Sequence, residues 1–215
     1  MEPIDDAVDH VRGPAAGRLI VEYGDYECPY SRRAFREIEP VERQLTEGVR
    51  FAFRHFPLTE IHPHALAASA AAEAAARQDR FWDMHELLFH RQTALEDGDL
   101  RRYAAELELD VALFDSDRTG AAVLGRVGRD VESGIASGEV GGTPTLFTES
   151  CTAAATTWPA CWRRWLDERD LLAHGHDRAD RAAGRDNRVR GLSGDRGDMG
   201  ASAHVSVLRS GRMLR

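Results

Sequence analysis

The stretch Val21–Phe35, VEYGDYECPYSRRAF, joins two different periodicities through a single cysteine. The run Arg18–Gly24 is short, apolar and bounded by glycines, which predicts a buried β-strand. After the cysteine, apolar side chains recur at helical spacing. Pro29 suits the first turn of that helix, because an N–H at this position would have no intrahelical partner. Cys28 is therefore predicted to lie between a buried strand and the N-terminus of a helix.

The remaining pattern predicts an α/β protein in which a block of helices precedes the last strand. A strand with one buried face is predicted at Val49–Phe56, and the sequence GGTPTLF, Gly141–Phe147, predicts a short strand after a glycine pair. Between these strands the apolar spacing predicts helices at Ala65–Arg77, Phe81–Gln92, Leu100–Leu107 and Thr119–Ser137.

The composition predicts a soluble globular protein of the cytoplasm. The chain has 215 residues, a formal net charge of −8 and only three cysteines. It contains no apolar run of the roughly 18 residues that a membrane span needs. Its acidic start lacks the apolar core of a secretory signal. Because phosphate binding needs a basic surface, we expect neither nucleic acid nor a membrane among its partners.

Cys28 and Pro144 are the residues with the clearest chemical potential. Unpaired amides at a helix N-terminus stabilise a thiolate, the nucleophile of disulfide exchange, whereas most lone cysteines are small buried apolar residues. The bond Thr143–Pro144 follows two glycines and precedes a strand, which makes it a candidate for a cis peptide, although most bonds before proline are trans. Together the two features indicate a groove in which an extended peptide lies against a thiol.

Four segments resemble the DsbA family of thioredoxin-fold proteins, namely VEYGDYECPYSRRA, FRHFPLTEIHPHALAASAAAEAA, RFWDMHELLF and GGTPTLF. More narrowly, they resemble the cytoplasmic bacterial branch that also occurs fused to sodium/proton antiporters. The resemblance covers residues 18–147 and implies a thioredoxin-like fold with a helical insertion. It also implies that Cys28 is the attacking cysteine of a motif that includes Pro29 and Tyr30. Thr143–Pro144 would then form the cis-proline loop that binds substrate.

Ser31 departs from this pattern, because it stands where the family has its second, resolving cysteine. A dithiol attacks a disulfide through one sulfur and releases itself through the other, and a hydroxyl cannot form a disulfide. The predicted activity is therefore exchange by one thiol, with protein or small-molecule thiols and disulfides as partners. We expect no bound cofactor and a glutathione-like low-molecular-weight thiol as co-substrate. Nothing in the sequence places Cys151 or Cys161 near Cys28.

Two other interpretations stay open at this point. A non-catalytic thioredoxin-fold module could bind peptides or a partner protein through the same groove. The chain could also be a remnant with impaired activity. The oligomeric state is not predicted.

The histidines do not form a recognisable metal motif. His62 and His64 lack a helical pair spacing because Pro63 lies between them, and no cysteine accompanies them. We predict no metal site, and a helix-capping or surface role for these two and for His55, His85 and His90.

The sequence changes character after Phe147. Residues 148–172 hold three of the four tryptophans and predict either one helix or a segment translated out of its ancestral reading frame. Residues 173–215 are rich in Arg, Gly and Asp without a hydrophobic period, which predicts a disordered tail. With residues 1–17 as a lead-in and 18–147 as the thioredoxin-fold domain, the closing strand and helix are predicted to be lost or replaced. The last strand would then keep an unpaired edge.

Overall fold

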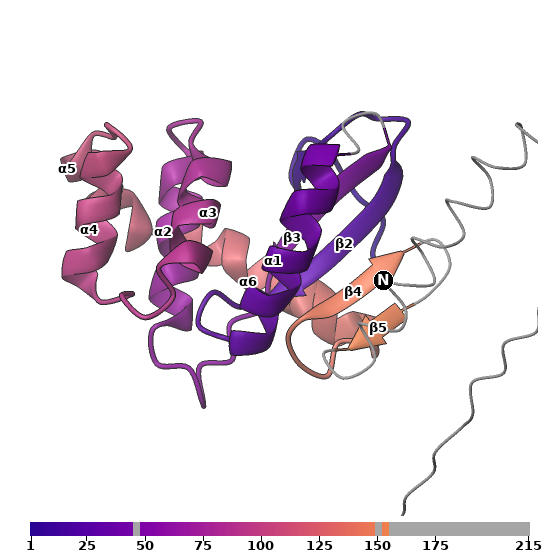
Figure 1. The fold of residues 1–215 in the computed structure, drawn as a ribbon. Helices are drawn as coiled ribbons and strands as arrows, with labels where there is room; N and C mark the ends of the chain where they lie inside the picture. Colours follow the sequence, from indigo (N-terminus) through magenta and orange to yellow (C-terminus); the bar gives the residue numbers. More distant parts are fainter. Residues whose placement is uncertain (45–47, 149–151, 155–215) are drawn as a thin grey trace, which may run out of the picture. The chain divides into compact units, whose positions relative to one another are not determined.

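The computed structural model describes residues 1–44, 48–148 and 152–154 (Figure 1). Their chain order alternates strands and helices before a long helical block. The elements are β1 (His10–Arg12), β2 (Arg18–Gly24), α1 (Pro29–Gln44), β3 (Val49–His55), α2 (Ala65–Ala76), α3 (Phe81–His90), α4 (Asp97–Glu106), α5 (Val111–Arg118), α6 (Ala121–Ser137), β4 (Thr145–Thr148) and β5 (Thr152–Ala154).

The described strands form one mixed sheet in the order β1-β3-β2-β4-β5. Strands β2 and β3 are parallel and in register to their ends, where Gly24 is opposite His55. Strand β4 runs antiparallel to β2, with Tyr23 opposite Thr145. The C-terminal ends of β2 and β3 and the N-terminal end of β4 therefore lie at the same end of the sheet. The cysteine that follows β2 and the proline that precedes β4 are brought together at this end.

The two faces of the sheet are buried against different elements, because successive side chains of a strand point to opposite sides. Ile20 packs in the larger core cluster, which includes residues of α1, α2 and α3. Val21 and Tyr23 belong to a second, smaller cluster, and Tyr23 meets α6 at Ser133 and Gly134. Figure 1 accordingly shows α1 on the near face and α6 crossing behind the sheet.

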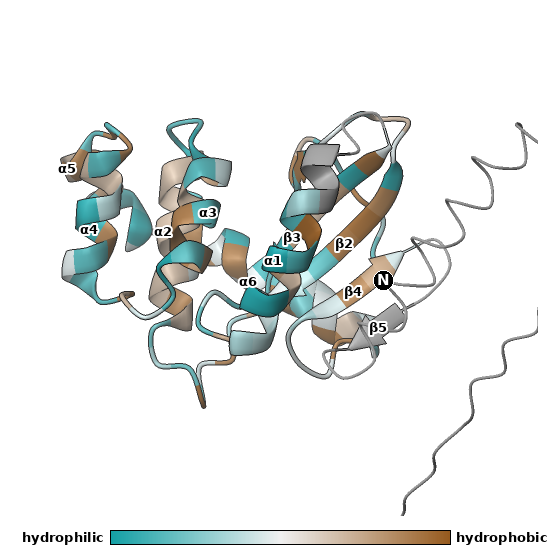
Figure 2. Ribbon diagram, viewed as in Figure 1, coloured by the Kyte–Doolittle hydropathy of each residue, from teal (hydrophilic) through white to brown (hydrophobic). Residues whose placement is uncertain are grey.

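Helices α2 to α5 form a block beside the sheet, and α2 is its centre. Helix α2 is almost entirely alanine, and nearly all of its residues are buried. Small side chains let neighbouring helices approach closely, so α2 contacts α3, α5 and α6 at once. The hydropathy colouring in Figure 2 shows α4 as mostly hydrophilic, in contrast to the largely apolar strands β2 and β3.

The structure adds β1, α5 and β5 to the predicted elements. Residues 1–17 were assigned no strand, yet β1 pairs antiparallel with β3. The single helix predicted from Thr119 is preceded by a separate helix, α5, whose first turn is capped by the Asp110 carboxylate accepting from the Leu113 N–H at 3.0 Å. A short charged helix with one buried residue, Phe114, has too weak an apolar period to be recognised.

The prediction of an unpaired edge at β4 is wrong. Thr152–Ala154 forms β5 and pairs antiparallel with β4, with Phe147 opposite Thr152. A strand therefore pairs with this side of β4. The helix or altered reading frame predicted for 148–172, and the tail 173–215, lie almost wholly outside the described residues. Within those residues, no helix combines the length and apolar character needed to cross a membrane.

Candidate active site

Cys28 lies between β2 and the first residue of α1, as predicted. Its carbonyl accepts from the Arg32 N–H at 3.1 Å, which is the first backbone hydrogen bond of the helix. Its thiol donates to the Thr143 carbonyl oxygen, with Sγ 3.2 Å from that oxygen. The Thr143–Pro144 bond is cis, as the sequence predicts. The fold therefore brings together two site segments that are more than a hundred residues apart in the chain.

The other motif residues differ sharply in exposure. Tyr30 is 58% exposed, whereas Cys28 is 3% exposed and Ser31 is fully buried. The Ser31 hydroxyl accepts from the Asp25 N–H at 3.2 Å. Ser31 thus helps to close the turn that carries Cys28. Cys151 and Cys161 lie outside the described residues, and within those residues Cys28 is a free thiol.

Two carboxylates before the cysteine tie its turn to the loop that follows β3. Asp25 is fully buried and accepts from the Glu27 N–H at 2.8 Å, from the Leu58 N–H at 2.9 Å and from His62 Nδ1 at 2.7 Å. Glu27 accepts from the His64 N–H at 2.6 Å, directly before α2. The carboxylates therefore position the backbone around Cys28, a role that sequence analysis did not assign to them.

Gln92 holds the same turn through its side-chain amide, and no sequence pattern indicates this role. Its Nε2 donates to the Tyr26 carbonyl at 2.7 Å and to the Cys28 carbonyl at 2.9 Å. A lone glutamine in a loop 64 residues after the cysteine has no motif and no periodicity that would single it out.

Tyr26 and His85 fill the core beneath the turn. The Tyr26 hydroxyl and His85 Nδ1 are hydrogen-bonded at 3.0 Å, and both residues are buried. Desolvation holds the pKa of Tyr26 well above its usual value and the pKa of His85 well below its usual value, so both are neutral at pH 7. The surface role predicted for the histidines is wrong for His85 and His55, because the fold places both in the interior.

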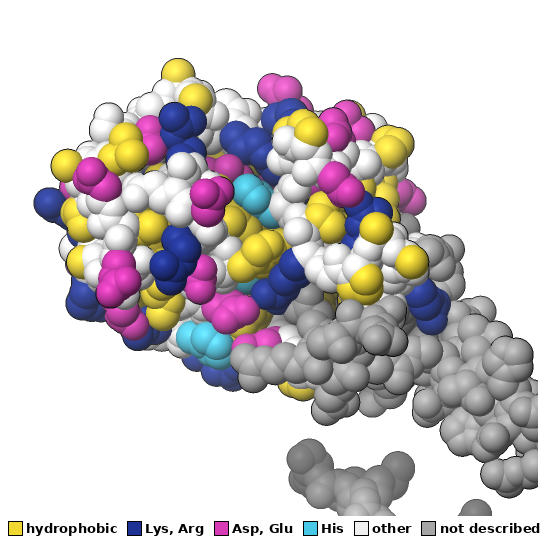
Figure 3. All heavy atoms as spheres, turned by 90° about the horizontal axis from the view of Figure 1, so that it is seen from above, with side chains coloured by type: hydrophobic (Ala, Val, Ile, Leu, Met, Phe, Trp, Pro, Cys, Tyr) yellow, Lys and Arg dark blue, Asp and Glu magenta, His cyan; other side chains and the backbone are white. Residues whose placement is uncertain are grey.

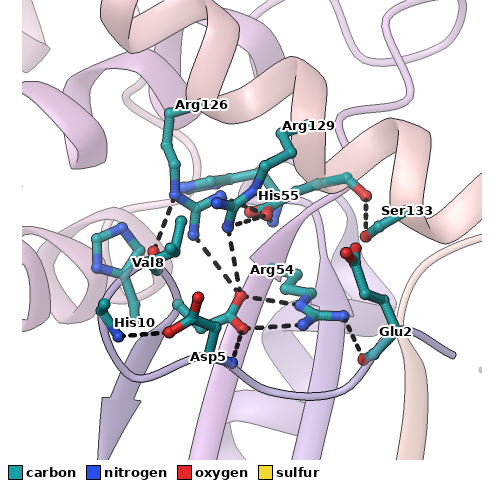
Figure 4. Close-up of polar contacts among 12 residues, drawn as sticks. Glu2, Asp5, Val8, His10, Arg54, His55, Arg126, Arg129 and Ser133 are labelled. Carbon is teal, nitrogen blue, oxygen red and sulfur yellow. Dashed lines mark hydrogen bonds and ion pairs between the residues drawn. The ribbon is translucent and has the colours of Figure 1, made fainter.

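A second polar cluster connects the N-terminal segment to β3 and α6 (Figure 4). Arg54 makes two parallel hydrogen bonds to Asp9, at 3.0 and 2.9 Å, and a third to the Tyr23 hydroxyl at 2.8 Å. Burial raises the pKa of Asp9, but the hydrogen bonds from Arg54 and the Asp5 N–H and the nearby guanidinium charges outweigh it, so the pKa is lowered. The lead-in segment is therefore part of the folded domain.

His10, His55 and Glu73 form a triad next to this cluster. Both imidazole Nε2 atoms are hydrogen-bonded to the same carboxylate oxygen of Glu73, at 2.8 and 2.9 Å. Burial raises the pKa of Glu73, but these two hydrogen bonds hold it far below its usual value.

These three residues are of types that bind transition metals, and their ligand atoms lie within 4.8 Å of one another. The Arg126 guanidinium lies 3.9 Å from the same Glu73 oxygen and would repel a second cation. We therefore assign the triad a structural role, and the absence of a metal site stays a prediction.

Charged side chains of both signs are interspersed on the face shown in Figure 3. Exposed charged side chains also pair across elements, as Arg91 of the turn after α3 does with Glu106 of α4. Such exposed pairs contribute little to stability and mainly keep the surface polar.

Comparison with known proteins agrees with this geometry. A family model described as thioredoxin matches residues 6–168, which extends beyond the boundary predicted at 147. The chain is 47% identical over 154 residues to the Na(+)/H(+) antiporter NhaA 3 of Salinispora tropica and 43% identical over 150 residues to NhaA 1 of Mycolicibacterium gilvum. Each match covers 68% of this chain but only 22% and 24% of those proteins, so the chain spans less than a quarter of these relatives.

Solved structures show the same fold. A thioredoxin-like oxidoreductase from Silicibacter pomeroyi superposes with a TM-score of 0.63 at 24% identity, covering 75% of this chain and 94% of that one. The thiol-disulfide exchange protein alpha-DsbA2 of Wolbachia pipientis gives a TM-score of 0.64 at 18% identity, covering 76% and 88%. The chain belongs to the thioredoxin family, and its sheet with an inserted helical block is the arrangement found in DsbA-like members.

Proposed function

We propose that this protein catalyses thiol-disulfide exchange with Cys28 as its single reacting thiol. The observation that carries the proposal is the position of Cys28 Sγ at the N-terminus of α1, 3.2 Å from the Thr143 carbonyl oxygen. Family membership supports the same chemistry. Unpaired amides at a helix N-terminus interact favourably with anions in general, and a thiolate is the attacking species of disulfide exchange.

Ser31 limits the reaction to a monothiol cycle. The Cys28 thiolate attacks the glutathionyl sulfur of a mixed disulfide, the S–S bond breaks, and the substrate leaves as a thiolate that takes a proton. A second low-molecular-weight thiol then attacks the sulfur bound to Cys28, which releases the cysteine and forms the oxidised low-molecular-weight disulfide. The substrate sulfur is released as a thiol, the glutathionyl sulfur stays in a disulfide throughout, and the incoming thiol loses its proton and takes the place of the substrate in that disulfide, so the number of disulfide bonds is unchanged. Such a cycle needs a reducing thiol pool, which supports a cytoplasmic location.

Thr143–Pro144 is the proposed substrate-binding segment. Cys28 is nearly buried and donates to the Thr143 carbonyl, so attack requires this contact to open. A disulfide that approaches beside Thr143 would replace the thiol hydrogen as the neighbour of the carbonyl. The exposed Tyr30, two residues after the cysteine, would border the bound substrate.

Turnover of a peptide–glutathione mixed disulfide tests the proposal. The test protein carries Cys151→Ser and Cys161→Ser, so that Cys28 is its only thiol. Glutathione is supplied, and formation of its disulfide is followed by glutathione reductase and NADPH oxidation. We expect turnover that is abolished by Cys28→Ser. Peptide binding without turnover would instead support a non-catalytic binding module and refute the enzyme proposal.

Ser31→Cys in the same background tests the reason for monothiol chemistry. Because position 31 is one helical turn from Cys28, we expect the two thiols to form a disulfide on mild oxidation, with a loss of two hydrogens by mass spectrometry. This variant should then oxidise dithiol peptides, which the protein with Ser31 cannot do. Failure of the two thiols to pair would show that the turn does not present residue 31 to Cys28.

A further inference from the structure

Gln92 makes direct contact with the backbone of the turn that carries the reacting thiol. Its two Nε2 hydrogens point at two carbonyl oxygens, those of Tyr26 and Cys28, at 2.7 and 2.9 Å. Both partners are acceptors, so the amide orientation of Gln92 is determined by them. The Cys28 carbonyl thereby receives two donors, the Arg32 N–H and Gln92.

The turn that presents Gln92 is itself held firmly. The Ala94 N–H donates to the Arg91 carbonyl at 2.9 Å, and the Tyr103 hydroxyl donates to the Ala94 carbonyl at 2.8 Å. Gln92 is therefore fixed relative to α4, and its hydrogen bonds hold the turn of Cys28 at a defined position relative to the helical block.

Removal of the Gln92 amide would change the backbone conformation of the turn around Cys28. Two carbonyl oxygens that converge on one nitrogen repel each other once the nitrogen is removed. The Cys28 carbonyl keeps the Arg32 N–H, but the Tyr26 carbonyl loses its Gln92 donor, and a partly buried carbonyl that loses a donor is costly. The Cys28 carbonyl is also the first acceptor of α1, so its orientation sets how the cysteine meets the helix N-terminus. A shift here moves the sulfur relative to the amides that favour its thiolate.

We propose that Gln92 is a positioning residue for Cys28, which holds the thiol at the N-terminus of α1 by bridging the Tyr26 and Cys28 carbonyls. The inference rests on the proposed thiol-exchange function. It assigns a role in the reaction to the inserted helical block, whose other polar contacts with the domain, such as His85 with Tyr26 and Glu73 with His55, do not involve the backbone of Cys28.

The test is the pH profile of Cys28 alkylation by iodoacetamide, followed by the mass of the Cys28 peptide. This readout depends on the ionised fraction of the thiol and not on its overall accessibility, because only the half-maximal pH is compared. Gln92→Ala is expected to move that pH upward by about half a unit, the size of a partial loss of a helix N-terminal charge interaction. Gln92→Glu should move it further, since an ionised carboxylate both lacks donors and opposes a second negative charge.

Gln78 provides a matched control. Its side-chain amide also bridges backbone groups, donating to the Asp110 carbonyl at 3.2 Å and accepting from the Asp110 N–H at 2.8 Å, but it joins α2 to α5. Gln78→Ala should leave the alkylation profile unchanged. Circular dichroism and urea unfolding confirm that each variant is folded, and Gln92→Met, which keeps the side-chain volume without donors, replaces Gln92→Ala if that variant does not fold.

The outcomes separate this inference from the proposed function. A profile for the Gln92 variants that coincides with Gln78→Ala overturns the positioning role, even if the unsubstituted protein turns over the mixed disulfide. A shifted profile in a protein without turnover supports positioning and refutes the enzyme proposal instead.

Discussion

The buried ion pair between Arg54 and Asp9 predicts a large loss of stability when one partner is neutralised. The Arg54 and Asp9 side chains are 3% and 1% exposed, and their two parallel hydrogen bonds measure 3.0 and 2.9 Å. Asp9→Asn removes the negative charge and turns an amide N–H₂ toward guanidinium donors. The guanidinium is then buried without a counter-charge, while Arg126 and Arg129 remain within 4.0 and 3.7 Å of position 9.

Breaking one partner of a buried pair costs about 3–5 kcal/mol, because the remaining charge has lost its solvation and its partner. We expect Asp9→Asn to lower the free energy of unfolding by this amount in urea titrations followed by circular dichroism. The exposed pair Arg33–Glu37 is the control, and Arg33→Ala should cost less than about 1 kcal/mol.

A double variant tests whether the two side chains stabilise the fold as a pair. Asp9→Leu combined with Arg54→Met removes both charges, so it should destabilise less than the sum of the two single variants. A loss below about 1 kcal/mol for Asp9→Asn, or strict additivity in the double variant, would refute the assignment of residues 1–17 to the buried network.

Two further predictions concern α6 and the buried histidines. A Cβ on Gly134 would lie 2.9 Å from the Phe56 ring, so Gly134→Ala should destabilise the fold. Gly128→Ala on the same helix meets open space and should stabilise the fold by about 0.5–1 kcal/mol. Thermal melts of the two variants should therefore show shifts of opposite sign. Desolvation lowers the pKa of His85 and of His10, so below about pH 6.5 the unfolded state binds protons that the folded state does not, and stability falls as pH decreases through this range. Urea midpoints between pH 7.5 and 5 should show this slope, and it should be shallower in His85→Asn; an equal slope in both proteins contradicts the assignment to His85.

The local sequence was sufficient for the elements that frame the thiol. β2, Cys28 and α1 follow one another in the chain, and each is specified by its own periodicity and by Pro29. The cis bond before Pro144 could be anticipated because glycines and a strand surround it. The sequence also shows directly that position 31 carries a serine hydroxyl instead of a second thiol.

Patterns were least informative where an element is short or its partner is remote. β1 has three residues and becomes a strand only by pairing with β3. β5 likewise exists through its pairing with β4, although its sequence predicted a broken fold. Neither strand has enough residues for an apolar alternation to be visible on its own.

The residue identities alone supply a thiol at position 28 and rule out a disulfide between positions 28 and 31. The surroundings of Cys28 come from the fold, because the contacts of its thiol with Thr143 and of its carbonyl with Gln92 join residues 115 and 64 positions apart. Hydrogen bonds between distant segments leave no periodic trace in the chain, since each depends on one polar side chain at one place. Folding brings these groups together when it buries the apolar faces of the sheet, and the position of the thiol follows from that packing.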